Sequence, residues 1–222
     1  MTTQNQDSID PFWKSKLRTE PGPDDEPGPD DDELLSQSLS DEQPVEFTPT
    51  TVVERMESQV IPIEDDLKGW VSRSLKRSSK YKNHFDVAED RYGLPPGMLI
   101  SVAAIESGGD PKVGSHAGAR GLMQFIEPTA KEYGLHVEGP VDERLDPVKS
   151  IDAAGRLLRD SIKRSEGDIY QALIMYNWGS GNWAKWKSGE KQMMPDETRR
   201  YLGRFREAMK QASGMSDTSV AR

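Results

Sequence analysis

The sequence contains no cysteine at any of its 222 positions. We therefore expect neither a disulfide framework nor a catalytic thiolate, and no lipoprotein anchor, which requires an N-terminal cysteine. Long apolar runs are missing as well, so we expect no membrane-spanning helix, and the N-terminus lacks the apolar segment of a signal peptide. A protein of this kind that acts outside the cytoplasm must leave it by another route.

Apolar side chains are scarce, at 34% of the residues, and the charges are unevenly distributed. Residues 1–60 hold 15 acidic and 4 basic side chains, a net charge of −11, whereas residues 61–222 hold 23 and 25, a net charge of +2. The low apolar content indicates that part of the chain lies outside a packed core. The weakly basic remainder suits an anionic polymer as a partner but does not indicate a nucleic acid.

The acidic segment is predicted to be a disordered tail. PGPDDE at 21–26 is followed at once by PGPDDD at 27–32, a low-complexity repeat that buries no apolar surface. Phe12 and Trp13 form an isolated apolar island in this tail. They are either a docking peptide for another protein or incidental residues of a linker.

Residues 61–213 show the spacing of a helical domain, between the tail over 1–60 and a C-terminus over 214–222 that we expect to be flexible. Alternating strand patterns are nearly absent, so the fold class is mainly α. We expect an irregular loop over 136–146 and at most a small β-hairpin around Gly118–Gln124. The expected apolar helix faces consist of Leu67, Trp70, Val71 and Leu75; Tyr81, Phe85, Ala88 and Tyr92; Ile151, Ala154, Leu158 and Ile162; and Tyr201, Phe205 and Met209.

Capping residues indicate where these helices begin and end. Gly93 is placed to end the second helix, and Asp146 and Asp168 are typical N-caps for two later helices. The basic side chains of the first helix, among them Lys76 and Arg77, are interpreted as its solvated face.

A helix over Leu99–Glu106 carries a carboxylate on its apolar face. Pro95 and Pro96 stiffen its start, and Gly108–Gly109 are placed to end it. Burial and the negative end of the helix dipole both raise the pKa of Glu106, as a general acid working near neutrality requires. The alternative is a solvated glutamate at a frayed helix end. The polar, glycine-rich loop that follows favours the first interpretation, because such a loop can form a substrate-binding wall.

Several short motifs stand in the order and approximate spacing of one known family. They are ES at Glu106–Ser107, Ser115, GLMQ at Gly121–Gln124, YN at Tyr176–Asn177 and ETRRY at Glu197–Tyr201. With them the sequence resembles the soluble lytic transglycosylase (SLT) domain of the goose-type, lysozyme-like superfamily over about residues 80 to 210. It departs from the family pattern at Met175, where alanine is usual, and at Gly109, where a bulky residue is common.

The resemblance implies a lytic transglycosylase that cleaves peptidoglycan between MurNAc and GlcNAc and needs no cofactor or metal. Glu106 would protonate the glycosidic oxygen and then, as a carboxylate, deprotonate the MurNAc C6 hydroxyl to close a 1,6-anhydro ring. The hydroxyl of Tyr176 would bond to Glu106 and orient it, and Met123 and Tyr201 would line the cleft. The residues implied to bind substrate are Ser115, Met123, Gln124, Tyr176, Asn177 and Tyr201.

Two other functions fit the same fold: a true lysozyme that hydrolyses this bond, and a structural virion protein that binds glycan without cleaving it. Most glycosidases use two carboxylates, but the nearby Asp110 and Glu127 are expected in an exposed turn and at an exposed helix start. Trp178, Trp183 and Trp186 form either a glycan-binding rim or a packed cap over the helix ends.

The missing export signal, taken with the resemblance, indicates a phage protein. Such a protein is virion-associated, or it stays in the host cytoplasm until it is released, and it acts in the periplasm or cell wall. We therefore expect peptidoglycan as its substrate and other virion proteins as partners of the acidic tail.

Overall fold

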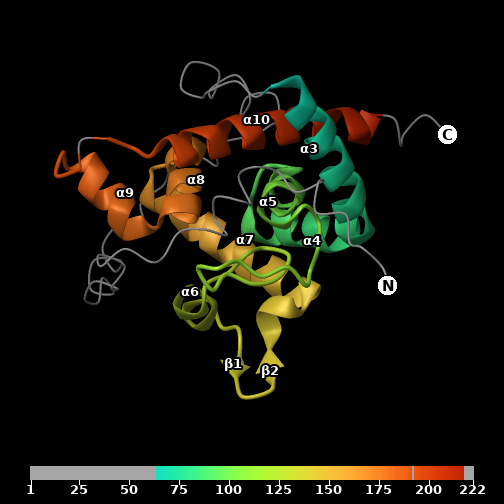
Figure 1. Cartoon of the computed structure of the whole chain (residues 1–222), viewed down its shortest axis with the longest axis horizontal. Helices are drawn as coiled ribbons and strands as arrows, with labels where there is room; N and C mark the ends of the chain where they lie inside the picture. The colour runs from blue at the N-terminus through green and yellow to red at the C-terminus, as the bar shows by residue number, and fades with distance from the viewer. Residues whose placement is uncertain (1–63, 192, 218–222) are drawn as a thin grey trace.

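The computed structural model describes residues 64–191 and 193–217, which form a mainly helical body (Figure 1). The acidic tail over 1–60 lies outside the described residues. Within these two ranges, no helix is long and apolar enough to cross a bilayer. The helices are α3 (Asp65–Ser78), α4 (Lys82–Tyr92), α5 (Met98–Ser107), α6 (Glu127–Glu132), α7 (Pro147–Arg164), α8 (Ile169–Trp178), α9 (Ser180–Lys187) and α10 (Asp196–Asp217), with single 3-10 turns at Ser79–Tyr81 and Glu143–Leu145.

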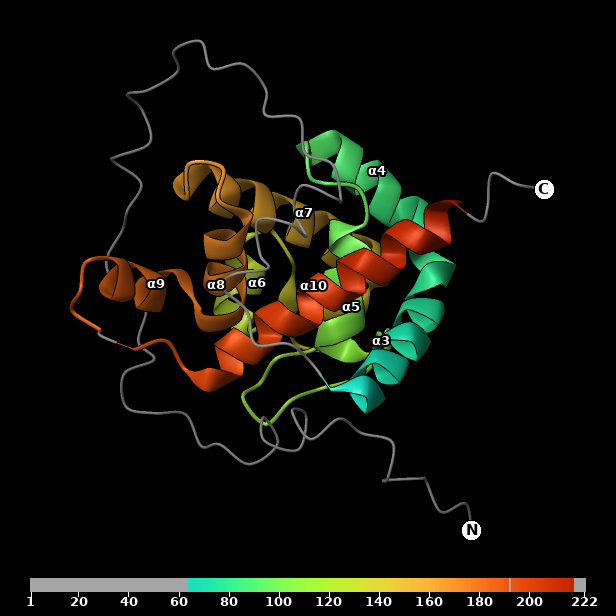
Figure 2. The ribbon, with the colours of Figure 1, turned by 90° about the horizontal axis from the view of Figure 1, so that it is seen from above.

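The helix α5 lies at the centre of the core. All ten of its residues are buried, so the expected single apolar face is wrong, and the helix is enclosed by the core on every side. Helices α3 and α10 pack against it, and Figure 2 shows α10 crossing over α5 with α3 alongside. The helix begins at Met98 after Gly97, whose φ is +84°, so Pro95 and Pro96 precede the helix and are not part of its first turn.

The expected caps of the surrounding helices are confirmed, and their expected apolar faces are buried except for the half-buried Leu67, Tyr81 and Tyr92. The carboxylate of Asp146 accepts hydrogen bonds from the N–H groups of Val148 and Lys149 at the start of α7, and Asp168 caps α8 in the same way. Gly93 ends α4 in the left-handed conformation. These caps fix where each helix begins and ends, because they satisfy the backbone groups that a helix terminus leaves unpaired.

The β-hairpin lies elsewhere than expected. Strands β1 (Val137–Glu138) and β2 (Val141–Asp142) pair antiparallel within the segment predicted to be an irregular loop, and they project from the helical body (Figure 1). Around Gly118–Gln124 there are only isolated bridges, which join Arg120 to Gly114 and to Phe125. The sequence analysis recognises strands by the alternation of apolar and polar residues, and strands of two residues are too short to show it.

The helix α10 closes the domain. It buries Tyr201, Phe205 and Met209 completely, as their spacing predicted. It continues past position 213, where the sequence analysis placed the end of the domain, and reaches Asp217. Gly214 does not end it, because one glycine costs a helix only about 1 kcal/mol.

Candidate active site

Glu106 lies in the last turn of α5, and only 3% of its surface is exposed. The turn ends at Gly108, which adopts the left-handed conformation with φ of +61°. The buried carboxylate predicted from the sequence is therefore present at the C-terminal end of the central helix. A carboxyl group in this environment has little water around it, and protein groups take the place of that water.

Two tyrosines from different helices surround Glu106. Burial first, and then the negative charge of Glu106, raises the pKa of Tyr201 on α10 well above its ordinary value. The same two causes raise the pKa of Tyr176 on α8. Among the described residues the Tyr201 hydroxyl has no hydrogen bond of regular geometry, although it approaches the carboxylate closely enough for the two groups to interact. Both hydroxyls therefore stay neutral beside Glu106.

The hydroxyl of Tyr176 has a different partner from the one expected. It donates a hydrogen bond of 2.8 Å to the backbone carbonyl of Met123, and not to Glu106. The prediction that this hydroxyl bonds to Glu106 is therefore wrong. The helical spacing indicated the direction of the side chain but not which loop packs against it. Tyr176 consequently ties α8 to the loop that carries the GLMQ motif.

That loop, over residues 113–125, presents Gln124 in a fixed conformation. Gln124 has a φ of +53°, and its Nε2 donates to the carbonyls of Val113 and Gly121 at 3.1 and 2.8 Å. Its Oε1 is buried and has no partner within the described residues. Ser115 closes the other end of the loop, since its Oγ accepts a bond from the N–H of Ala119. The loop therefore keeps one amide oxygen free to accept a hydrogen bond.

Asn177 adds a free donor next to Tyr176. Its Nδ2 is buried and finds no acceptor in the described part of the chain. Buried amide groups in proteins are nearly always paired, so the acceptor on Gln124 and the donor on Asn177 are available to a polar ligand or to water.

Arg144 is a structural residue of the site that the sequence analysis missed. It is 5% exposed, forms an ion pair with Asp142 at 2.8 Å and donates to the carbonyls of Gly118 and Phe125 at 3.0 and 3.4 Å. The backbone approaches so closely here that a Cβ on Gly121 would lie 1.7 Å from the Arg144 carbonyl oxygen. Arg144 thereby joins the hairpin to the loop that holds Gln124.

Met123 and Tyr201 do not line an open cleft in this conformation. Both side chains are completely buried, because the central position of α5 draws the neighbouring loop and helix into the core. Ser115, Tyr176 and Asn177, in contrast, retain partly exposed surface.

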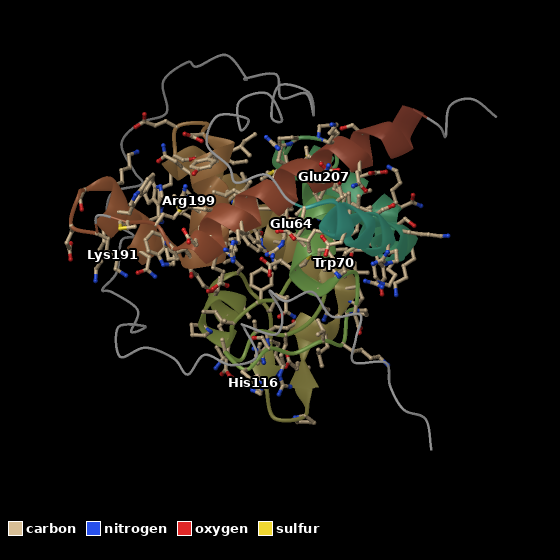
Figure 3. The ribbon with its side chains drawn as sticks, turned by 45° about the horizontal axis from the view of Figure 1, so that its top comes forward. Glu64, Trp70, His116, Lys191, Arg199 and Glu207 are labelled. Atoms are coloured by element: carbon tan, nitrogen blue, oxygen red, sulfur yellow. The ribbon has the colours of Figure 1, made fainter. Side chains whose placement is uncertain are left out.

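The three tryptophans do not all share one environment, so neither the packed cap nor the glycan-binding rim describes the whole cluster. Trp183 is buried, and its Nε1 donates to Gln171 at 3.0 Å, so it belongs to a packed cap. Trp178 is half-buried beneath the ammonium group of Lys191, 5.3 Å from its ring centre. Trp186 lines a cavity of about 250 Å³ with Tyr170, Met193, Met194 and Arg199. Figure 3 shows Lys191 and Arg199 at this end of the molecule, near α9 and the start of α10.

Comparison with known protein families gives a match to the model described as the transglycosylase SLT domain, over residues 83–198. The peptidoglycan transglycosylase gp16 of Escherichia phage T7 is 35% identical over 130 residues, which are 56% of this chain and 10% of that protein. The transglycosylase of Enterobacteria phage PRD1 is 38% identical over 104 residues, 46% of this chain and 37% of that protein. The chain therefore corresponds to a minor part of each relative.

Solved structures show the same fold. The 70 kDa soluble lytic transglycosylase SLT70 of Escherichia coli superposes with a TM-score of 0.54 at 21% identity, over 61% of this chain and 24% of that one. An inactive mutant of the lytic transglycosylase Slt of Pseudomonas aeruginosa gives a TM-score of 0.53 at 18% identity, over 63% and 25%.

Proposed function

The chain belongs to the transglycosylase SLT domain family, and we propose that it cleaves the glycan strand of peptidoglycan as a lytic transglycosylase. The observation that carries the proposal is the buried Glu106 at the end of α5, with the orphaned amide groups of Gln124 and Asn177 on the neighbouring loop and helix. Relatives named as transglycosylases in two phages support the same activity.

The proposed reaction uses Glu106 twice. As a neutral acid it donates its proton to the oxygen between MurNAc and GlcNAc while the glycosidic bond breaks. The acetamido oxygen of the substrate stabilises the cationic carbon that forms. The Glu106 carboxylate then accepts the proton of the MurNAc C6 hydroxyl, whose oxygen closes the 1,6-anhydro ring. The proton that Glu106 gives to the leaving oxygen is replaced by the proton that it takes from the C6 hydroxyl, so the reaction consumes no water.

The next two carboxylates after Glu106 in the sequence, Asp110 and Glu127, support this one-acid scheme over hydrolysis by a pair. Asp110 is exposed, and its carboxylate accepts a bond from the N–H of Lys112 in a local turn. Glu127 is exposed and pairs with Lys131 at 2.9 Å, which lowers its pKa. Neither is positioned as the second carboxylate of an ordinary glycosidase, so a true lysozyme is the less favoured alternative.

The amide groups that lack partners suit an N-acetylated sugar. An acetamido substituent carries one N–H donor and one carbonyl acceptor, and the site offers one acceptor, Gln124 Oε1, and one donor, Asn177 Nδ2. We propose that Ser115, which is half-exposed on the same loop, contacts a sugar hydroxyl. A sugar without the acetamido group would leave both buried groups unpaired.

The deciding experiment compares Glu106→Gln with the wild type on purified peptidoglycan. We expect a loss of roughly a hundred- to ten-thousand-fold in turnover with an unchanged melting temperature, because general acid–base catalysis contributes that much. Glu127→Gln is the matched control and should keep its activity. Mass spectrometry of the products should find 1,6-anhydro ends, whereas reducing ends would show that the protein is a lysozyme. A turnover of Glu106→Gln within tenfold of the wild-type value would rule out Glu106 as the catalytic acid.

We further propose that the protein acts on the cell wall during phage infection or lysis. The phage relatives support this context. Association of the acidic tail with other virion proteins through Phe12 and Trp13 is a separate proposal, because these residues lie outside those that the structure describes. Mass spectrometry of purified virions tests it directly, and absence of the protein from particles would favour a role at lysis.

A further inference from the structure

The helix that carries Glu106 has no other charged residue of its own. Its sequence, MLISVAAIES, offers no basic side chain in the last turn, where the free carbonyl groups and the negative end of the helix dipole lie. A cation at this position must therefore come from another element. Glu106 belongs to this last turn, two residues before the C-cap Gly108.

The helix α3 supplies that cation. The Nε of Arg77 donates a hydrogen bond of 2.6 Å to the carbonyl oxygen of Gly108, the C-cap of α5. Its Nη2 lies 3.3 Å from the hydroxyl of Ser74 on the same helix, which holds the guanidinium group in place. Arg77 is exposed, as the predicted solvated face requires, and its guanidinium group in addition bonds to α5.

The two helices also approach each other too closely for side chains at this junction. A Cβ on Gly108 would lie 2.9 Å from Nη2 of Arg77, and a Cβ on Gly109 would lie 2.8 Å from the backbone nitrogen of Ser78. Both glycines have positive φ, at +61° and +81°. The close contact with α3 thus restricts the conformation of the Gly108–Gly109 turn, and Arg77 bonds to the carbonyl of Gly108.

We propose that Arg77 is a positioning residue for Glu106, which it holds in place through the Gly108 carbonyl while it sets a positive charge at the end of α5. This inference rests on the proposed function of Glu106. Arg77 lies outside the segment over 83–198 that matches the family model, so the family signature does not include it.

The charge of Arg77 acts on the balance between the neutral and ionised forms of Glu106. Within residues 64–191 and 193–217, the tyrosines Tyr176 from α8 and Tyr201 from α10 face the acid, and both are kept neutral by burial and by the charge of Glu106. A cation at the helix end favours the carboxylate, which is the form needed for the second proton transfer. Removing it should therefore extend the neutral form to higher pH.

The test measures the pH dependence of kcat for Arg77→Gln, Arg77→Lys and the control Lys76→Gln, whose side chain is exposed one residue away on α3. For Arg77→Gln we expect kcat to fall about tenfold with KM little changed, because the acid is misplaced rather than the substrate. The alkaline limb of the profile should move up by about half a pH unit. Arg77→Lys retains the positive charge, so the pH of the alkaline limb should stay unchanged while kcat falls in part. Lys76→Gln should change neither kcat nor the alkaline limb.

A purely structural role would lower the melting temperature of Arg77→Gln and leave both kcat at the optimum and the alkaline limb unchanged, and that result would overturn the proposal. If Arg77→Gln does not fold, Arg77→Lys carries the test, and an unchanged kcat for it overturns the proposal equally. The titration of the Glu106 carboxyl followed by NMR gives the same shift without substrate. That readout separates this inference from the proposed function, which fails on its own if the wild type releases no glycan fragments.

Discussion

Glu89 is a buried carboxylate that lies at the start of α5, at the opposite end of this helix from Glu106. It is 4% exposed, and its two oxygens accept hydrogen bonds from the N–H groups of Gly97 and Leu99, at 2.8 and 2.7 Å. Burial raises its pKa to about 7, although these two bonds act in the other direction. Among nearby charges, Asp86 raises the pKa further and Lys82 lowers it. The start of α5 is thereby fixed to α4 by a group that titrates near neutrality.

This raised pKa predicts how stability depends on pH. The folded value of about 7 lies above the ordinary 4.5, so the contribution of Glu89 is fully present below pH 4.5 and is lost as the pH rises through 7. The difference amounts to about 3 kcal/mol in the free energy of unfolding. Urea unfolding between pH 4.5 and 7.5 should show the wild type losing this stability relative to Glu89→Gln, whose side chain does not titrate.

The exposed Glu132→Gln is the matched control for this comparison, and it should follow the wild type at every pH. Parallel curves for the wild type and Glu89→Gln would show that Glu89 titrates in the folded protein as it does in the unfolded chain.

At the scale of single residues, the sequence predicted groups whose signals are local and missed those whose partners are distant. Glu106 was found because an apolar helix and two glycines flank it. Arg77 and Arg144 were not, since each acts on a carbonyl that lies 31 or 26 positions away in the chain. The partner of Tyr176 is 53 positions away and belongs to the backbone, so no side-chain pattern could identify it.

Among the elements, the loop over 113–125 depends on one glycine more than on its neighbours. Gly121 and Gly118 have nearly equal φ, +81° and +79°, so alanine strains the backbone similarly at both. Only at Gly121 would the new Cβ meet another atom, the carbonyl oxygen of Arg144; at Gly118 there is none within 4 Å. Comparing alanine substitutions at Gly121 and Gly118 therefore distinguishes the effect of backbone strain from the effect of pushing the Arg144 backbone away.

We expect Gly121→Ala to lower turnover on peptidoglycan by tenfold or more, roughly the effect of moving a binding group by 1 Å. Gly118→Ala should lose only about 1 kcal/mol of stability and keep most of its activity. Melting temperatures and turnover of the two variants are the measurements. Equal losses in both would mean that strain, and not the contact with Arg144, governs the loop.

Helix ends were the most predictable feature of the elements, because Asp146, Asp168 and Gly93 satisfy backbone groups within a few residues. The hairpin was misplaced for the opposite reason. Its pairing is held by the turn at Gly139, whose φ is +57°, and by the ion pair of Asp142 with Arg144 rather than by alternating side chains.

The whole molecule extends beyond the segment that matches the family. Helix α3 precedes residues 83–198, and most of α10 follows them, yet both pack against α5, and Gln211 bonds to the carbonyl of Lys68 across 143 positions. The mainly helical fold was predicted correctly. The arrangement of the helices was not, because contacts between the two ends of a domain leave no periodic signal.

We therefore expect a fragment over 64–217 to unfold cooperatively in urea and a fragment over 83–198 to lack a cooperative transition, because α5 would lose the cover of two helices. Circular dichroism is the measurement. The longer fragment also tests the expectation that residues 1–60 add little to the core. Cooperative unfolding of the shorter one would show that α3 and α10 are accessory.

The position of α10 has a consequence for the timing of activity during synthesis. Helices α3 to α9 leave the ribosome first, but Tyr201 is on α10, so one side of Glu106 stays open to water until that last described helix emerges. Contacts between distant parts of a chain form late, because the intervening segment must first be ordered. A nascent chain that stops short of α10 would carry every residue from Glu106 to Asn177 and still lack an enclosed acid. Translation itself thus sets the moment at which the site is complete.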